Sequence, residues 1–325
     1  MNFTFFDIYA IFSYPMSKDL ISIHDLSSSE IEDIFKLAAD LKQKQKRKEK
    51  HEYLWAKSLA MIFEKQSTRT RVSFEIGMWQ LGGLAINLDQ EAIGLGTRES
   101  IGDVAKTLSR YADGILIRTF AHDKVIELAK YADIPVINGL SDLSHPCQAL
   151  TDIFTVIEKK GKDLKKLKMA YIGDGNNVCH SLMFAAAKVG LNLTIATPKG
   201  YEPDPDIVKL AFEDARKAGV EIDILNDPVI AAENADVIYT DVWASMGQEK
   251  EKVVRLKAFR KFQINKELVK VAKPDYIFMH CLPAHRGEEV TDEVIDSPNS
   301  VVFDQAENRL HVQKAILVKF LGGNT

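Results

Sequence analysis

The apolar positions of the chain follow helical and strand-like periods in turn, beginning near residue 27. Ser27 and Glu30 form a candidate capping box, and apolar residues then recur at helical spacing from Ile31 to Leu41. Apolar runs typical of buried strands follow at 59–63, 84–88, 114–118 and 135–139, with helical stretches between them at 70–81, 100–112 and 122–131. This alternation predicts a parallel α/β domain.

A second series of the same kind occupies the rest of the chain. Strand-like runs lie at 168–173, 193–197, 221–225, 236–241, 276–281 and 301–304. Helical stretches lie near 178–189, 205–218 and 263–272, and a last helix covers 307–321. The predicted fold class is therefore α/β, with two parallel-sheet α/β domains and the active site in the cleft between them.

The predicted domain boundary lies within a helix near residues 147–160, just before Gly161. We expect an N-terminal extension at 1–16, a first domain at 17–150, a second domain at 151–305 and a C-terminal helix at 306–325 that packs back on the first domain. The extension lacks a basic start and contains Asp7, so it does not resemble a signal peptide. No run reaches the roughly 18 apolar residues of a membrane span, and we expect a cytoplasmic protein without a membrane partner.

Composition excludes several classes of protein. A length of 325 residues suits two domains, and a net charge of −4 provides no basic field for nucleic acid. The cysteines are Cys147, Cys179 and Cys281, an odd number without a CxxC pair. This usage argues against a disulfide framework and against a zinc ribbon.

Polar residues gather where the predicted strands end. They are the STRTR segment at 67–71, Arg118, residues 145–148, the GDGNN segment at 173–177, Asp241, and His280 with Cys281. Ligands of parallel α/β sheets bind beyond the carboxyl ends of the strands. Six clusters at six strand ends therefore predict one composite binding site.

Each cluster has a functional and a purely structural interpretation. STRTR can bind an anion through helix N-terminal N–H groups and arginine side chains, or it can be a capped helix with surface arginines. His145 can donate to a carbonyl oxygen and Gln148 can bind an amide, or the histidine can be structural. Asp241 can pair with a substrate amine or can cap a turn.

Motifs for a cofactor, a metal or a nucleophile are missing from the sequence. In the GDGNN segment Val178 replaces the third glycine of a dinucleotide-binding loop, and residues 193–200 supply no acidic residue for a ribose. An amide such as Asn177 facing the site is the better interpretation of this segment. His280 and His285 do not form an HExxH motif, and no GxSxG elbow supports a nucleophile. We therefore predict no cofactor and no metal, and a site that acts by positioning and electrostatics.

Together the motifs STRTR, HPCQ, GDGNN, DVWASMG, HCLPAHRGEE and QAENR resemble those of the ornithine carbamoyltransferase family. The resemblance runs in the family's order from about residue 19 to 322, and the SMG and HCLP segments are its ornithine-specific part. It implies transfer of a carbamoyl group from carbamoyl phosphate to the δ-amine of L-ornithine, which gives L-citrulline and phosphate in arginine metabolism. It also implies that the first domain binds carbamoyl phosphate and the second binds ornithine.

The resemblance implies a role for each of several residues. Carbamoyl phosphate would contact Ser67, Thr68, Arg69, Thr70, Arg118, His145, Pro146, Cys147, Gln148, Cys281, Leu282 and Arg309. Ornithine would contact Asn177, Asp241, Ser245 and Met246, with Asp241 facing its α-ammonium group. The catalytic residues would be Arg118, His145, Asp241 and Cys281.

The chemistry of these residue types agrees with that reaction. Attack of an amine on an activated carbonyl develops an oxyanion, for which Arg118, His145 and the Thr70 hydroxyl are suitable donors. Only the neutral amine attacks, and its pKa is close to the ~10.4 of lysine, so activity should rise with pH. We expect Asp241 and Cys281 to orient the amine and to assist proton loss.

One position departs from the family pattern. Gly94, in the GLGTRES loop, stands where the family commonly carries Gln or His, and Arg98 is a candidate substitute for the missing side chain. The resemblance also implies a homotrimer or a larger assembly of trimers. Other acceptors (aspartate, putrescine or an acylated ornithine), a catalytically silent paralogue and an NAD-dependent dehydrogenase are the alternative functions.

Overall fold

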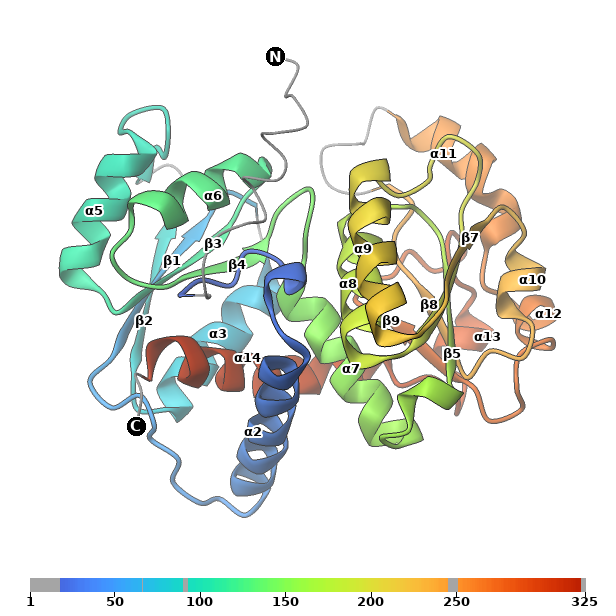
Figure 1. Ribbon diagram of the computed structural model, residues 1–325, viewed down its shortest axis with the longest axis horizontal. Coiled ribbons are helices and arrows are strands. Elements are labelled where there is room, and N and C mark those ends of the chain that lie inside the picture. The colour runs from blue at the N-terminus through green and yellow to red at the C-terminus, as the bar shows by residue number, and fades with distance from the viewer. Residues whose placement is uncertain (1–17, 66, 90–92, 245–250, 323–325) are drawn as a thin grey trace. The chain divides into compact units, whose positions relative to one another are not determined.

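The computed structural model describes residues 18–65, 67–89, 93–244 and 251–322. The chain forms two compact units (Figure 1). Unit 1 comprises the residues up to Leu150 together with those from Arg309 onward, and unit 2 comprises Thr151–Asn308. Two helices, α7 (Pro146–Lys160) and α14 (Val302–Leu321), contribute residues to both units. The predicted N-terminal extension at 1–16 lies outside the described residues.

Unit 1 contains a parallel sheet with the strand order β2-β1-β3-β4. The strands are β1 (Ser58–Phe63), β2 (Leu84–Asp89), β3 (Gly114–Arg118) and β4 (Val136–Leu140). The helices are η1 (Ile23–Asp25), α2 (Ser28–Lys46), α3 (Thr68–Gln80), α5 (Ile101–Tyr111) and α6 (His122–Tyr131). Apolar residues of α5 and α6, such as Val104 and Val125, pack with Ile62 and Ile117 of the sheet in one buried cluster. Helix α3 packs against α14, where Gly77 lies against Lys314 and Leu317.

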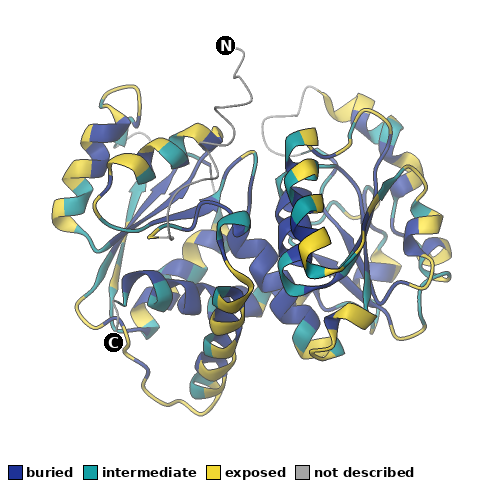
Figure 2. Cartoon of the chain, in the orientation of Figure 1, coloured by how far each residue is buried: buried dark blue, intermediate teal, exposed yellow. Residues whose placement is uncertain are grey.

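Unit 2 contains a parallel sheet with the strand order β7-β6-β5-β8-β9. Its strands are β5 (Lys168–Ile172), β6 (Asn192–Ala196), β7 (Ile222–Leu225), β8 (Val237–Thr240) and β9 (Ile277–His280). Its helices are η2 (Leu164–Lys166), α8 (Asn177–Val189), α9 (Pro205–Ala218), α10 (Pro228–Ala232), α11 (Lys252–Phe259), η4 (Arg260–Phe262), α12 (Lys266–Val269) and α13 (Asp292–Ile295). The central strands are buried and helical surfaces are exposed (Figure 2). The order in which successive strands are added reverses beside β5, and doubly wound proteins bind ligands at such a point.

Local sequence explains where the helices begin and end. The predicted capping box of Ser27 and Glu30 is confirmed at the start of α2. Asp204 caps α9, which has Pro205 at its first position, and Gly219 ends it in the left-handed conformation. Nine of the ten predicted strands are confirmed within one residue at either end.

Two predicted elements are wrong. Residues 301–304 are not a strand, because α14 begins at Val302 and the pairing with β9 is limited to a single bridge between Ser300 and Phe278. The last helix therefore begins five residues earlier than predicted. The predicted helix over 263–272 is reduced to α12, because Ile264 pairs with Val290 in a β-bridge and cannot be helical. Asn265 then caps the short helix.

Candidate active site

The first cluster lies at the carboxyl ends of the strands in unit 1, where β1 leads into α3. Ser67 caps α3, and its hydroxyl accepts the Thr70 N–H at 3.1 Å. Thr68 and Arg69 form the first turn of that helix. The start of α3 therefore combines helix N–H groups, hydroxyls and a guanidinium group, which together favour an anion.

Two further arginines converge on the same helix start. Arg118 is the last residue of β3, and its Nη1 donates to Thr70 Oγ1 at 3.4 Å. Arg309 of α14 donates from Nη2 to the same oxygen at 2.8 Å and from Nη1 to Gln148 Oε1 at 2.9 Å. Thr70, Arg118, Gln148 and Arg309 are all buried. The structure thus brings together side chains that lie up to 239 positions apart in sequence.

His145 is an uncharged member of this cluster. Its side chain is buried, and its pKa is held well below the ordinary value by desolvation and by the positive charges of Arg309, Arg118 and Arg69. A neutral imidazole can donate a hydrogen bond without adding charge to the site. His145 therefore adds a neutral donor to the cationic donors of the cluster.

The residues after His145 begin α7. Pro146 is its first residue, and Cys147 is buried with Sγ 3.6 Å from the carbonyl oxygen of Asn138. Burial raises the pKa of this thiol to about 12. Cys147 is consequently a protonated packing residue, and its side chain is not a nucleophile.

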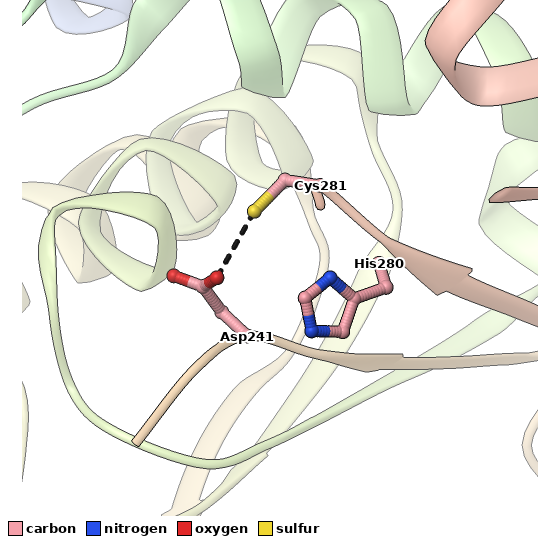
Figure 3. Close-up of side chains that lie close together, drawn as sticks. All are labelled: Asp241, His280 and Cys281. Atoms are coloured by element: carbon pink, nitrogen blue, oxygen red, sulfur yellow. Dashed lines mark hydrogen bonds between the residues drawn. The ribbon is translucent and has the colours of Figure 1, made fainter. Parts of the chain in front are cut away.

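The second cluster lies at the carboxyl ends of the strands in unit 2. Asp241 follows β8 and Cys281 follows β9, and the thiol of Cys281 donates to Asp241 Oδ1 at 3.0 Å (Figure 3). The other carboxylate oxygen, Oδ2, accepts from Asn176 Nδ2 at 2.9 Å. Asp241 is 6% exposed, so its negative charge lies in a sheltered position at the sheet edge.

Sequence reasoning selected Asn177 in this segment and missed the contribution of Asn176. Asn176 caps α8: its side-chain oxygen accepts the N–H groups of Val178 and Cys179, while its amide donates to Asp241. Asn177 is the first residue of the helix and is partly exposed. The preference for asparagine at the position directly before a helix is the sequence signal that could have identified Asn176.

An ion pair beside the second cluster was also missed. Arg255 of α11 donates from Nη1 to Asp174 Oδ2 and to the Trp243 carbonyl, both at 2.9 Å. Burial raises the pKa of Asp174 to about 6, and the charge of Arg255 opposes that rise. Ser245 and Met246, both predicted to contact ornithine, lie outside the described residues.

Among the described residues, two groups of side chains have the spacing of metal ligands. The first is Asp241, His280 and Cys281, but both ring nitrogens of His280 already have partners, the Leu282 N–H and Glu289. The second is His285, Glu288 and Glu289, where Lys252 Nζ lies 2.8 Å from Glu288. The contacts of neither group favour a metal ion, and the absence of a metal stays a prediction.

Comparisons with known proteins agree on one family. The family model "Aspartate/ornithine carbamoyltransferase, carbamoyl-P binding domain" matches residues 18–158, and the "Asp/Orn binding domain" model of the same family matches residues 165–320. An ornithine carbamoyltransferase of Thermococcus kodakarensis is 59% identical over 94% of this chain and 97% of its own length. An anabolic ornithine carbamoyltransferase of Pyrococcus furiosus is 58% identical over 94% of this chain and 97% of its own.

Solved structures give the same result. The structure of the Pyrococcus furiosus ornithine carbamoyltransferase matches with a TM-score of 0.92 at 58% identity, covering 94% of this chain and 98% of that chain. That of the Thermus thermophilus enzyme matches with a TM-score of 0.83 at 44% identity, covering 94% and 99%. No helix in the described ranges combines the length and the apolar composition needed to cross a bilayer.

Proposed function

The chain belongs to the aspartate/ornithine carbamoyltransferase family, and we propose that its two clusters divide the reaction between them. The reaction moves the carbamoyl group of carbamoyl phosphate to the δ-amine of L-ornithine and yields L-citrulline and phosphate. One observation supports the division above all others. Unit 1 gathers arginines around a neutral histidine, whereas unit 2 presents a sheltered carboxylate. The first arrangement suits a dianion and the second suits an amino acid's ammonium group.

The phosphate group binds at the start of α3 in this proposal. Ser67, Thr68, Arg69 and Thr70 contribute hydroxyls, backbone N–H groups and the principal cation. Helix N-termini attract anions through their unpaired N–H groups and the helix dipole. Arg69 adds a guanidinium group that matches two phosphate oxygens at once.

The carbamoyl group binds beside the phosphate. Arg118, His145 and Thr70 donate to its carbonyl oxygen, and Gln148 binds its amide, with Arg309 holding Gln148 Oε1 at 2.9 Å. Pro146 and Cys147 complete this segment through their backbone. Donors aimed at a developing oxyanion are each worth roughly 3 kcal/mol of the barrier.

The amine substrate binds in unit 2. Asp241 receives the α-ammonium group, and Asn177, Ser245 and Met246 complete the contacts with ornithine. Cys281 and Leu282 lie where the two substrates meet, and the neutral δ-amine attacks the carbamoyl carbon. The C–O bond to phosphate then breaks, and the proton of the amine leaves with phosphate. Phosphate is a good leaving group, so the reaction needs neither a covalent intermediate nor a Lewis acid.

An exposed apolar surface in unit 1 supports assembly of the chain into a homotrimer. It consists of Val72, Ile76 and Trp79 on α3 and of Leu84 and Ile86 on the edge strand β2. Trp79 is 73% exposed, and unpartnered edge strands with apolar residues favour association.

We place the enzyme in the cytoplasm, in arginine biosynthesis, as the anabolic Pyrococcus furiosus relative suggests.

The test is product formation from carbamoyl phosphate with a set of acceptors: ornithine, putrescine, N-acetylornithine and aspartate. We expect turnover with ornithine alone. N-acetylornithine lacks the charged α-ammonium group that Asp241 receives in this proposal, putrescine lacks the α-carboxylate, and aspartate lacks a side-chain amine. Preference for N-acetylornithine would overturn the role of Asp241, and preference for putrescine or aspartate would overturn the assignment of the other ornithine contacts. Either result would leave the carbamoyl phosphate site intact. Absence of turnover with all four would indicate a catalytically silent paralogue.

A further inference from the structure

His280 and Glu289 form a fully buried pair that the proposed function does not use. Both side chains are 0% exposed, and His280 Nε2 lies 3.1 Å from Glu289 Oε1. His280 ends β9 and directly precedes Cys281. Figure 3 shows its imidazole next to the thiol and carboxylate of the second cluster, without a hydrogen bond to either. Any effect of the pair on that cluster must therefore pass through another group.

That group is the backbone of Leu282. The Leu282 N–H donates to His280 Nδ1 at 2.8 Å. A backbone N–H is always a donor, so Nδ1 carries no proton and the neutral ring holds its proton on Nε2. That proton is donated to Glu289 Oε1, which also accepts the backbone N–H of His285 at 2.6 Å. One carboxylate oxygen thus fixes the tautomer of His280 and the far end of the HCLPAH segment.

The hydrogen bond from Leu282 to His280 spans Cys281. Leu282 has a φ of +59°, in the left-handed region that residues with a Cβ rarely adopt. Surrounding contacts must hold such a residue in place. On the other side of Cys281, the His280 N–H donates to Gln305 Oε1 at 3.0 Å. Cys281 is consequently held from both neighbours while its thiol donates to Asp241.

We propose that His280 and Glu289 are positioning residues for the carbamoyl transfer reaction. Glu289 keeps the proton of His280 on Nε2. The unprotonated Nδ1 of His280 then accepts the Leu282 N–H and holds the backbone that aims Cys281 and Leu282 at the substrates. The inference rests on the proposed function for the roles of Cys281 and Leu282. The contacts that carry it, however, come from the buried pair alone.

Two substitutions of His280 separate its two hydrogen bonds in the full-length enzyme. In His280→Asn the side-chain oxygen can occupy the position of Nδ1 and accept the Leu282 N–H, but the contact with Glu289 is lost. In His280→Gln the amide can reach Glu289, but no acceptor remains for Leu282. Each variant loses one buried hydrogen bond, so the two are matched in their expected loss of Tm.

We expect His280→Asn to keep kcat within about threefold of the unsubstituted enzyme and His280→Gln to lower kcat at least tenfold with a small change in the KM for carbamoyl phosphate. A second measurement, alkylation of Cys281 by iodoacetamide followed by mass spectrometry, does not depend on turnover. Cys147 and Cys179 are buried, so the reagent is selective. Alkylation should be at least threefold faster in His280→Gln and unchanged in His280→Asn.

Equal kcat losses in the two variants, or unchanged alkylation of Cys281 in His280→Gln, would overturn the proposal. If the unsubstituted enzyme shows no carbamoyl transfer, the proposed function fails, and the alkylation rates still decide whether His280 positions Cys281. Glu289→Gln and Glu289→Leu provide a second pair in case His280→Gln does not fold. In Glu289→Gln the amide oxygen can still accept the N–H groups of His280 Nε2 and of the His285 backbone. In Glu289→Leu neither N–H group has an acceptor, so this variant should show the lower kcat and the faster alkylation of Cys281 expected for His280→Gln.

Discussion

At the scale of single residues, the state of His145 determines which group titrates during turnover. Burial and three neighbouring guanidinium groups hold its pKa well below the ordinary value. The imidazole is therefore neutral throughout the range in which the substrate amine loses its proton. In the proposed function it donates a hydrogen bond to the carbonyl, and the acid–base step belongs to the substrate.

This assignment predicts the pH dependence of the rate. From pH 6 to 9, kcat/KM for ornithine should rise with the neutral fraction of the δ-amine and show no inflection near pH 6.5. His145→Gln should lower kcat about 100-fold, because an oxyanion donor is weakened, and keep the same profile. The measurement is initial rates of both enzymes across this range. An inflection near pH 6.5 that disappears in the variant would contradict a neutral His145.

The buried side chain of His122 makes the stability of the fold depend on pH. It is 8% exposed, its Nδ1 lies 2.7 Å from Ser141 Oγ, and burial lowers its pKa to about 4. Well above pH 6.5 His122 is neutral in both the folded and the unfolded state. As the pH falls from 6.5 toward 4, only the unfolded state binds the proton, so stability is lost in that window.

The size of the loss follows from the shift in pKa. Between pH 7 and pH 5, His122 should reduce the free energy of unfolding by about 2 kcal/mol. His122→Asn can retain the contact with Ser141 and does not titrate. Urea unfolding at the two pH values should show a smaller loss for the variant, and equal losses would rule out a buried neutral His122.

Residues at strand ends were predictable, and their supporting partners were not. Arg118, Asp241 and Cys281 follow apolar runs directly, so their places at the sheet edges can be deduced from the pattern. Asp174 pairs with Arg255, which lies 81 positions further along the chain. Glu289 reaches His280 only because the intervening segment turns back. Such pairs depend on tertiary folding, which hydrophobic periodicity does not encode.

At the scale of elements, the loop that begins at Gly94 has a backbone adapted to glycine. Gly94 has a φ of +58°, and its carbonyl accepts the N–H groups of Thr97 and Arg98. A Cβ at this position would lie 2.6 Å from the Cβ of Arg98. A residue with a side chain at position 94 therefore does not fit this loop conformation.

A pair of glycine substitutions tests this statement. Gly161 also has a positive φ, of +91°, but a Cβ there would meet nothing within 4 Å. Gly161→Ala should cost about 1 kcal/mol of stability from backbone strain alone, and Gly94→Ala should cost about 2 kcal/mol or more because a steric clash is added. Chemical denaturation of both variants gives the comparison. Equal costs would show that the Gly94 loop relaxes freely.

Helix α14 anchors α3 at both ends. Arg309 bonds to Thr70 in the first turn of α3, and Lys314 donates to Gln80 Oε1 at its last residue, at 2.9 Å. Burial lowers the pKa of Lys314 to about 8, and its ammonium group also donates to Gln45 at 2.8 Å. The early start of this helix was missed because the apolar residues at 301–304 fit a strand and a helix equally well in so short a run.

At the scale of the whole molecule, the chain pattern was sufficient for the fold class. Alternating strands and helices indicate parallel sheets, and the short connections limit the possible orders of the strands. The strand orders β2-β1-β3-β4 and β7-β6-β5-β8-β9 were not predictable in detail, because they depend on which side of the first strand each crossover passes. The two α/β units are confirmed.

The exposed apolar surface of α3 and β2 predicts the behaviour of the chain in solution. Trp79→Glu places a charge on that surface and should convert the proposed homotrimer to single chains in light scattering coupled to size exclusion. Val253→Glu, on an 80% exposed residue of unit 2, is the matched control and should leave the assembly intact. Dissociation by both variants, or by neither, would place the interface elsewhere.

In the proposed function the unit 1 cluster binds carbamoyl phosphate and the unit 2 cluster binds ornithine. Calorimetric binding of carbamoyl phosphate alone, combined with citrulline assays, tests it on Arg69→Ala and Asp241→Asn. We predict that Arg69→Ala binds carbamoyl phosphate at least tenfold more weakly. Asp241→Asn should bind it within twofold of the unsubstituted enzyme yet form citrulline at least 100-fold more slowly. Equal weakening of carbamoyl phosphate binding in both variants would contradict the division.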